Sequence, residues 1–384
     1  MQETCHSGQS LDLTGLETPR LLLDIDRLQR NADRMRRRCA ELGVQLRPHL
    51  KTSKSLPVAQ IAIEFGPIAV STLKEAEYFA ENGYRDILYA VAIAPNKVSR
   101  VGQIQEKTGT RILLVVDHIE AAQAIGRRAR DMDESFGCLI EVDCGEHRSG
   151  VLPLAETIIP IARALTESRA VTVEGVISHA GHSYTSGEPP VIKEIAEAER
   201  KSAAIAAQIL REANFACPIV SVGSTPTVLF AEHLNDVTQV RCGIYLFWDL
   251  AQFSRNVCEL EDIAVSVLAS VIGHNRQGSS IIIDAGALAL SKDLSANAYL
   301  PDAKHGFVCD PITLRRLGSL SVDVVHQEHG TIKVPGGEWF DYLPIGSLVR
   351  ILPNHTCLTC AAYEGYELVR QDKYIDYWPR CNGW

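Results

Sequence analysis

Long apolar runs are missing from this sequence. No segment reaches the roughly 18 consecutive apolar residues that a transmembrane helix needs. The polar stretch Met1–Leu13 also has no hydrophobic region of the kind found in a secretory signal. We therefore expect no membrane span, and these absences favour a cytoplasmic location.

An excess of positive charge is missing as well. Lysine and arginine together number 38 against 47 aspartates and glutamates, and the formal net charge is −9. A surface dedicated to nucleic acid or to an anionic membrane has the opposite balance. Because 46% of the residues are hydrophobic and 22% are charged, the composition is that of a globular protein. We expect a small-molecule partner, with no nucleic acid and no membrane.

The sequence has no regular cysteine framework. Its 11 cysteines lie between Cys5 and Cys381 at irregular spacings. An odd number of cysteines in a long chain without a signal peptide argues against a disulfide scaffold. We expect most of them to be free, buried thiols.

The first two thirds of the chain alternate short apolar runs with amphipathic stretches, which is typical of βα units. After a long helix expected at about Asp26–Leu42, the intervals between the apolar runs can carry further helices. The strand candidates are Val44–Arg47, Ile68–Thr72, Asp86–Val91, Arg111–Asp117, Cys138–Asp143, Val173–Ala180, Ile219–Gly223 and Thr238–Phe247. This pattern predicts an N-terminal (β/α)8 TIM barrel of the α/β class. The alternative, an open doubly wound sheet, usually has a glycine-rich first turn, which this sequence lacks.

The pattern changes after Asp249 to β-rich runs with turn residues and few helices. These runs are Ile263–His274, Ser279–Asp284, Leu320–His326, Leu348–Leu352 and Tyr366–Arg370. We expect a C-terminal, mainly β domain. The expected division places the barrel at residues 19–255 and the β domain at residues 256–384, joined by the N-terminal segment 1–18.

Polar residues follow the predicted strands at the end where barrels carry their chemistry. The seventh strand ends in Gly223-Ser224-Thr225-Pro226, whose glycine, hydroxyls and helix start are suited to hold a phosphate. The eighth strand adds Gly243 and Tyr245 at the second position where barrels commonly bind phosphate. The alternative is an ordinary capped helix with a packing glycine.

Lys51 follows the first barrel strand in the segment Arg47-Pro48-His49-Leu50-Lys51-Thr52-Ser53-Lys54. A partly buried lysine at the barrel mouth has a lowered amine pKa and can act as a nucleophile. The alternative is a solvated loop lysine, and Lys54 is a local competitor for the role.

His355 and Cys357 follow a predicted strand of the second domain. They lie two positions apart, so in an extended segment their side chains point to the same side and can hold one metal ion. Two protein ligands leave positions open for substrate, as a catalytic metal site requires. The alternative is a buried histidine and thiol. Cys360 completes a single CxxC with Cys357, but no second pair accompanies it.

Taken together, these segments resemble the D-threonine aldolase and D-serine dehydratase group of pyridoxal-phosphate enzymes, and the resemblance covers nearly the whole chain. The segments that carry it are Thr18-Pro19-Arg20-Leu21-Leu22-Leu23-Asp24, the Lys51 segment, Ser71-Thr72-Leu73-Lys74-Glu75-Ala76-Glu77, Val222-Gly223-Ser224-Thr225-Pro226-Thr227 and Pro353-Asn354-His355-Thr356-Cys357. The group has an alanine-racemase type (fold-type III) architecture, a barrel followed by a β domain. By fold analogy we also expect a homodimer.

The resemblance implies a role for each site residue. Lys51 would bind pyridoxal 5'-phosphate covalently and serve as the base. The residues Gly223, Ser224, Thr225, Gly243 and Tyr245 would hold the cofactor phosphate. His179 and Tyr184 would flank the cofactor ring, and Arg148 would lie near its pyridine nitrogen, where an arginine makes a weaker electron sink than a carboxylate does.

The metal motif separates the branches of the group. Aldolases usually show a histidine, one residue, and then an aspartate, whereas this chain has His355-Thr356-Cys357, which looks like the dehydratase pattern. A thiolate with an imidazole favours zinc, with manganese, cobalt or nickel as alternatives. The expected reaction removes the α-proton and the β-hydroxyl of a D-3-hydroxy amino acid, D-threo-3-hydroxyaspartate or D-serine, and gives a 2-oxo acid and ammonia. A retro-aldol lyase, a racemase and a non-catalytic cofactor carrier remain as alternatives.

Overall fold

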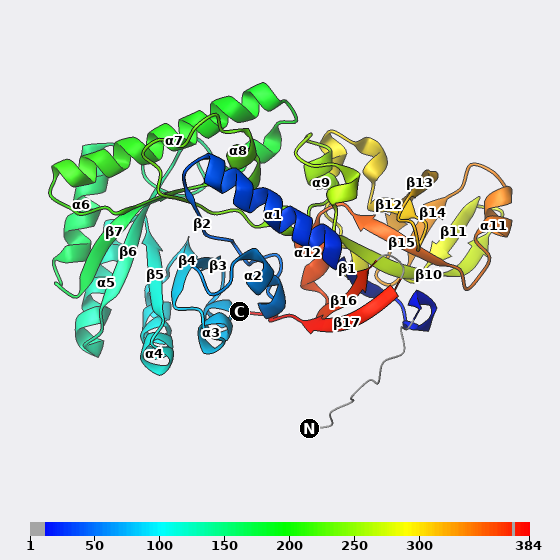
Figure 1. Cartoon of the computed structure of the whole chain (residues 1–384), viewed down its shortest axis with the longest axis horizontal. Helices are drawn as coiled ribbons and strands as arrows, with labels where there is room; N and C mark the ends of the chain where they lie inside the picture. Colours follow the sequence, from blue (N-terminus) through cyan, green and yellow to red (C-terminus); the bar gives the residue numbers. More distant parts are fainter. Residues whose placement is uncertain (1–11, 371–372) are drawn as a thin grey trace. The chain divides into compact units, whose positions relative to one another are not determined.

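The computed structural model describes residues 12–370 and 373–384. Its contacts divide the chain into two compact units (Figure 1). The barrel unit comprises Ala32–Tyr245 with Cys381–Trp384, and the β unit comprises the residues up to Asn31 with Leu246–Arg380. The division falls inside helix α1 (Ile25–Glu41).

The barrel unit is built on eight parallel strands in the order β2-β9-β8-β7-β6-β5-β4-β3. A parallel bridge between His49 and Ala69 joins the two ends of this order and closes the barrel. The strands are β2 (Gln45–Leu46), β3 (Ile68–Val70), β4 (Asp86–Ala92), β5 (Arg111–Val116), β6 (Phe136–Val142), β7 (Val171–Ser178), β8 (Ile219–Val222) and β9 (Gln239–Val240). The predicted barrel is confirmed. The last strand is shorter than expected because the chain leaves the sheet after Val240 and forms a 3-10 turn at Ile244–Leu246.

The barrel strands are apolar on both of their faces, because side chains fill the interior and helices cover the outside. In β5, five of the six side chains are buried. The interior is packed with Ala69, Leu88, Leu113, Val115, Leu139 and Ile177. The covering helices are α2 (Leu56–Ala62), α3 (Leu73–Glu81), α4 (Val98–Thr108), α5 (Ile119–Met132), α6 (Ala155–Thr166), α7 (Pro189–Glu212) and α8 (Thr225–Phe230).

The β unit holds a nine-stranded sheet in the order β11-β14-β13-β12-β15-β10-β1-β16-β17. Its strands are β1 (Arg20–Asp24), β10 (Val265–Asn275), β11 (Ser280–Ile283), β12 (Gly306–Cys309), β13 (Arg316–Val325), β14 (Gly330–Lys333), β15 (Leu348–Pro353), β16 (Gly365–Arg370) and β17 (Lys373–Pro379). Short helices α9 (Leu250–Phe253), α10 (Ala287–Leu290), α11 (Glu338–Tyr342) and α12 (Thr356–Ala361) lie in its connections. This mainly β unit agrees with the predicted fold class.

Strand β1 lies in a different unit from the one expected, because the expected division placed it in the barrel at residues 19–255. It pairs antiparallel with β10 and parallel with β16, so it belongs to the sheet of the β unit. The physical reason is that Leu21, Leu22 and Leu23 are all buried, and an apolar run of this kind fits the centre of either sheet. Of the N-terminal segment that we expected to join the β domain, residues 1–11 lie outside the described part of the chain.

The described cysteines agree with the expectation of free, buried thiols. All described cysteines are free, and each of them except the half-buried Cys357 is buried. In the part of the chain that the structure describes, no helix has the length and apolar character needed to cross a bilayer.

Candidate functional site

Lys51 lies in a turn just beyond β2 and is exposed rather than partly buried. Its neighbour Lys54 is engaged elsewhere, since its amine forms an ion pair of 3.2 Å with the fully buried carboxylate of Glu75. Among the described residues, no ion pair or hydrogen bond engages the Lys51 amine, and its backbone N–H donates to His49 Nδ1 at 3.4 Å. Lys51 is therefore the lysine of this segment that is available for chemistry.

Two histidines near Lys51 are held in the neutral form. Burial is the main cause that lowers the pKa of His179, to about 3, and the nearby cations Arg241 and Lys51 add to it. The same causes lower the pKa of His49 well below its usual value. The neutral ring of His179 donates from Nδ1 to the carbonyl of Gly223 at 2.8 Å. A ring fixed in this way can flank a planar ligand without bringing a second charge.

The turns after β7 and β8 are joined to each other by hydroxyl groups. Ser224 is the N-cap of α8 and its side chain accepts from the N–H of Thr227. The hydroxyls of Ser183 and Ser224 lie 2.7 Å apart. The N–H of Thr225 donates to the Tyr184 hydroxyl at 3.4 Å. The structure thus brings three predicted site residues, Tyr184, Ser224 and Thr225, to one place.

Buried hydroxyl groups in the turns after β8 and β9 are compatible with a bound phosphate. The hydroxyl of Tyr245 is buried, and among the described residues it has no hydrogen-bond partner. The buried hydroxyl of Thr225 meets the thiol of Cys242, which is a weak partner. A buried hydroxyl without a hydrogen-bond partner lowers the stability of the fold, so such groups usually bind a ligand or a water molecule. Gly243 has a second reason to lack a side chain, because a Cβ there would lie 2.5 Å from the carbonyl oxygen of His49.

Glu199 on α7 organises these turns, and no sequence motif identified it as a site residue. One carboxylate oxygen accepts from the backbone N–H groups of Ala180 and Gly223, at 2.9 and 3.0 Å. The other accepts from the Thr227 hydroxyl at 2.8 Å. Burial raises the pKa of Glu199 despite these bonds. The only signal in the sequence was an acidic residue on the inward face of a helix, and that face is recognisable only in the fold.

Arg148 is not drawn into this group of residues. Its side chain is 57% exposed, and its guanidinium lies 3.4 Å from the carboxylate of Glu146. It follows β6 at the same end of the barrel as the other turns, and it is near enough to His179 to lower the pKa of that ring. No hydrogen bond to another predicted site residue is found for it among the described residues.

In the β unit, His355 and Cys357 lie where β15 ends and α12 begins. His355 is the extended N-cap of α12, and Cys357 lies in the first turn of the helix. The expectation of a fully extended segment is therefore not met. The two side chains nevertheless meet, because a hydrogen bond joins the imidazole and the thiol. A residue at an N-cap and one in the following turn can converge in this way without an extended chain.

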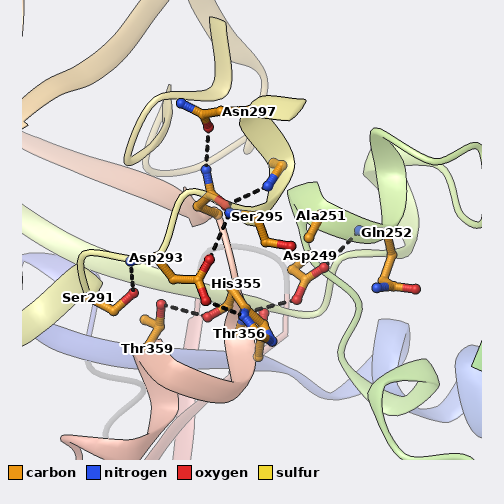
Figure 2. A network of polar contacts seen from close by, with 12 residues as sticks. Asp249, Ala251, Gln252, Ser291, Asp293, Ser295, Asn297, His355, Thr356 and Thr359 are labelled. Carbon is orange, nitrogen blue, oxygen red and sulfur yellow. Dashed lines mark hydrogen bonds and ion pairs between the residues drawn. The ribbon is translucent and has the colours of Figure 1, made fainter. Parts of the chain in front are cut away.

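Two aspartates distant in sequence hold this pair, and the sequence did not indicate either of them (Figure 2). Asp293 lies 2.9 Å from Nδ1 of His355, and the buried Asp249 accepts from the N–H of Thr356 at 3.0 Å. Burial opposes the charge on His355, but Asp293 and Cys357 outweigh it and raise the pKa of the imidazole to about 11.

The donor set fits a metal ion with few protein ligands. An imidazole oriented by a carboxylate, next to a thiol, is a common arrangement around zinc and similar ions. Among the described residues, no group of three or more histidine, cysteine, aspartate or glutamate side chains could hold a metal. Any metal here would therefore keep open positions.

Comparisons with known proteins match both units. The alanine racemase N-terminal domain matches residues 23–251, and a putative serine dehydratase domain matches residues 264–369. D-threo-3-hydroxyaspartate dehydratase of Delftia sp. strain HT23 is 42% identical over 382 residues, which cover 97% of this chain and 99% of the relative. D-serine dehydratase of Dictyostelium discoideum is 31% identical over 388 residues, covering 95% and 96%.

Solved structures agree with these matches. The Delftia dehydratase superposes with a TM-score of 0.94 at 41% identity, covering 97% of this chain and all of the other. A cysteine-to-alanine variant of D-threo-3-hydroxyaspartate dehydratase has been solved in a metal-free form. The D-threonine aldolase of Filomicrobium marinum shares the fold, with a TM-score of 0.83 at 21% identity.

Proposed function

The chain belongs to the D-serine dehydratase group of alanine-racemase-type pyridoxal-phosphate enzymes, and on that premise we propose that it is a metal-dependent D-3-hydroxy amino acid dehydratase. The proposed substrates are D-threo-3-hydroxyaspartate and D-serine, and the products are a 2-oxo acid and ammonia. The observation that carries the proposal is the 42% identity to a dehydratase over nearly the whole of both chains. Aldolases are more distant, for example a D-threonine aldolase at 26% identity.

In the barrel unit, Lys51 would hold the cofactor and remove the α-proton of the substrate. When bound, pyridoxal phosphate stabilises the negative charge that this proton leaves behind. Ser224, Thr225 and Tyr245 would hold the phosphate, a role supported by the unpartnered buried hydroxyl of Tyr245. The neutral ring of His179 would pack against the cofactor, since its Nδ1 is already occupied by the Gly223 carbonyl.

In the β unit, His355 and Cys357 would hold a divalent metal, whose Lewis acidity helps the β-hydroxyl to depart. Loss of water and hydrolysis of the released enamine then account for the oxo acid and ammonia. The imidazole and thiolate donors favour zinc, with manganese, cobalt or nickel as alternatives. By analogy with the fold we also propose a homodimer.

Product analysis tests the proposal. The purified protein loaded with pyridoxal phosphate is incubated with D-serine, D-threonine and D-threo-3-hydroxyaspartate, with and without a chelator. We expect oxo acid and ammonia in equal amounts, and their loss when the chelator is present. Glycine and an aldehyde would instead assign the chain to the aldolase branch, and the absence of any product would favour a cofactor carrier.

A further inference from the structure

We propose that Asp293 is a positioning residue that fixes the ring orientation and the tautomer of His355 for metal binding. The inference rests on the proposed function, because it concerns the same metal pair. Asp293 lies 62 positions before His355 in the sequence, and its Oδ2 lies 2.9 Å from Nδ1 of that ring. Nothing in the metal motif itself points to this residue.

Asp293 is fixed before it meets the imidazole. Its Oδ1 accepts from the N–H of Ser295 at 2.7 Å, and its own N–H donates to the Ser291 hydroxyl at 3.2 Å. Because Oδ1 is engaged by its own turn, Oδ2 is the oxygen left to meet His355. The carboxylate therefore has a preferred rotamer that does not depend on the ring.

The two segments that carry Asp293 and His355 are tied together on both sides of the contact, and Figure 2 shows the tie at Asn297. On one side, Asn354 accepts from the N–H of Ala296 at 2.9 Å and donates to Asn297 at 2.7 Å. On the other side, the Thr359 hydroxyl donates to the carbonyl of Leu290 at 2.9 Å. These ties fix the separation of the two backbones, so the contact between carboxylate and imidazole is built into the fold of this unit.

The chemical consequence follows from what each group can donate. A carboxylate only accepts, so the ring proton sits on Nδ1 and the lone pair of the neutral ring sits on Nε2. Nε2 is then the ring atom that can bind a metal, and the negative charge of the carboxylate makes the ring a better ligand. Asp249 has a different task, because its carboxylate accepts from the backbone N–H groups of Gln252 and Thr356.

The test measures metal affinity without any turnover. The cofactor-loaded, full-length protein is stripped of metal and titrated with Co²⁺, whose bond to a thiolate gives a near-ultraviolet absorption band. We compare the wild type with Asp293→Ala and Asp293→Asn, and with the exposed Asp302→Ala as a matched control. The dissociation constant should rise about 10- to 100-fold in Asp293→Ala, as is usual when the partner of a metal-binding histidine is lost.

The remaining readouts separate positioning from folding. Asp293→Asn keeps an oxygen that accepts from Nδ1 but loses the charge, so its affinity should lie between those of the wild type and Asp293→Ala. The thiolate band at saturation should persist in the wild type and in both Asp293 variants because Cys357 is unchanged. Asp302→Ala should bind Co²⁺ like the wild type. A contact that is merely structural would lower the melting temperature and leave the Co²⁺ affinity of the folded protein unchanged.

Each contrary outcome has a distinct meaning. Wild-type affinity in Asp293→Ala overturns the inference while leaving the proposed function intact. If Asp293→Ala does not fold, wild-type affinity in Asp293→Asn overturns the role of the charge. If the wild type binds no Co²⁺, or if a Cys357→Ser variant keeps the near-ultraviolet band, the metal pair of the proposed function fails and the inference falls with it.

Discussion

The barrel unit and the β unit hold their candidate residues in different ways. The barrel draws Lys51, Tyr184, Ser224 and Tyr245 from turns that follow four different strands. The β unit takes His355 and Cys357 from one short segment, which is clamped by aspartates from other loops. The first arrangement depends on the closure of a whole sheet, and the second depends on a few ties between neighbouring loops.

This difference determines how far a substitution should reach. In the barrel, a change in one turn is transmitted through backbone contacts, such as the close approach of Gly243 to His49. In the β unit, a substitution of Asp249 or Asp293 should alter the His355–Cys357 pair and leave the sheet intact. If the two regions are independent in this sense, variants can separate cofactor binding from metal binding.

The largest expected effect comes from Lys51→Ala. Removing the amine takes away both the anchor of the cofactor and the proposed base, so we expect kcat to fall by about 10³-fold or more. The absorption of the lysine-bound cofactor should also disappear, while Co²⁺ affinity stays at the wild-type level. Lys54→Ala is the matched control, because the Lys54 amine is paired with Glu75. Equal losses in both variants would contradict the assignment of Lys51.

Gly243→Ala tests the dependence of the barrel on backbone packing. The new Cβ would lie 2.5 Å from the His49 carbonyl oxygen, which is part of the backbone and yields little. We expect a loss of about 1–3 kcal/mol in the free energy of unfolding, the usual cost of overpacking, together with weaker cofactor binding. Urea unfolding measures the first and cofactor titration the second. Gly337→Ala is the control, since no atom lies within 4 Å of its added Cβ, and it should change stability by less than about 0.5 kcal/mol.

Glu199→Gln tests whether the turns after β7 and β8 are held by a titrating group. Burial raises the pKa of Glu199 above its ordinary value of 4.5, so the folded state binds this proton more tightly than the unfolded state does. The contribution of Glu199 to stability therefore falls as the pH rises from about 4.5 through the raised pKa, and it stays lower above it. Glutamine does not titrate, so its variant should gain stability relative to the wild type over that range. Because the amide keeps the shape of the protonated acid, the two proteins should differ by less than about 1 kcal/mol at the acidic end.

Urea unfolding of both proteins at several pH values, from about 4.5 to 8, gives this difference directly. A difference that does not change with pH would show that the Glu199 carboxylate titrates alike in the folded and unfolded chains.

The sequence predicted the strands and motifs that lie within one continuous segment. It did not predict contacts between residues that are distant in the sequence. All eight barrel strands were expected because buried parallel strands are continuous apolar runs. Lys51, the Gly223–Thr225 turn and the His355–Cys357 pair could be proposed as site residues from the sequence because each motif is local. The supports Glu199, Asp249 and Asp293 were missed, because a single acidic residue has no local pattern and becomes a partner only when the fold brings distant loops together. Strand β1 was expected in the barrel domain, residues 19–255, because its three buried leucines fit either sheet. Its pairing with β10 becomes visible only in the fold.

Tyr245→Phe should have the smallest effect of these substitutions. It should not lower the stability of the cofactor-free protein, but it should weaken cofactor binding. The Tyr245 hydroxyl is buried with no hydrogen-bond partner among the described residues, so removing it should leave the stability of the cofactor-free protein unchanged or slightly higher. If the hydroxyl binds the phosphate, the same change should weaken cofactor affinity about 5- to 10-fold, which corresponds to one hydrogen bond of about 1–1.4 kcal/mol.

Tyr84→Phe should behave in the opposite way, because its hydroxyl donates to the carbonyl of Ile63 at 3.0 Å and has no proposed ligand. That variant should lose about 1 kcal/mol of stability and keep its cofactor affinity. Melting curves and cofactor titrations should therefore give opposite patterns for the two variants if the Tyr245 hydroxyl binds the cofactor. Matching patterns would show that Tyr245 only packs in the interior.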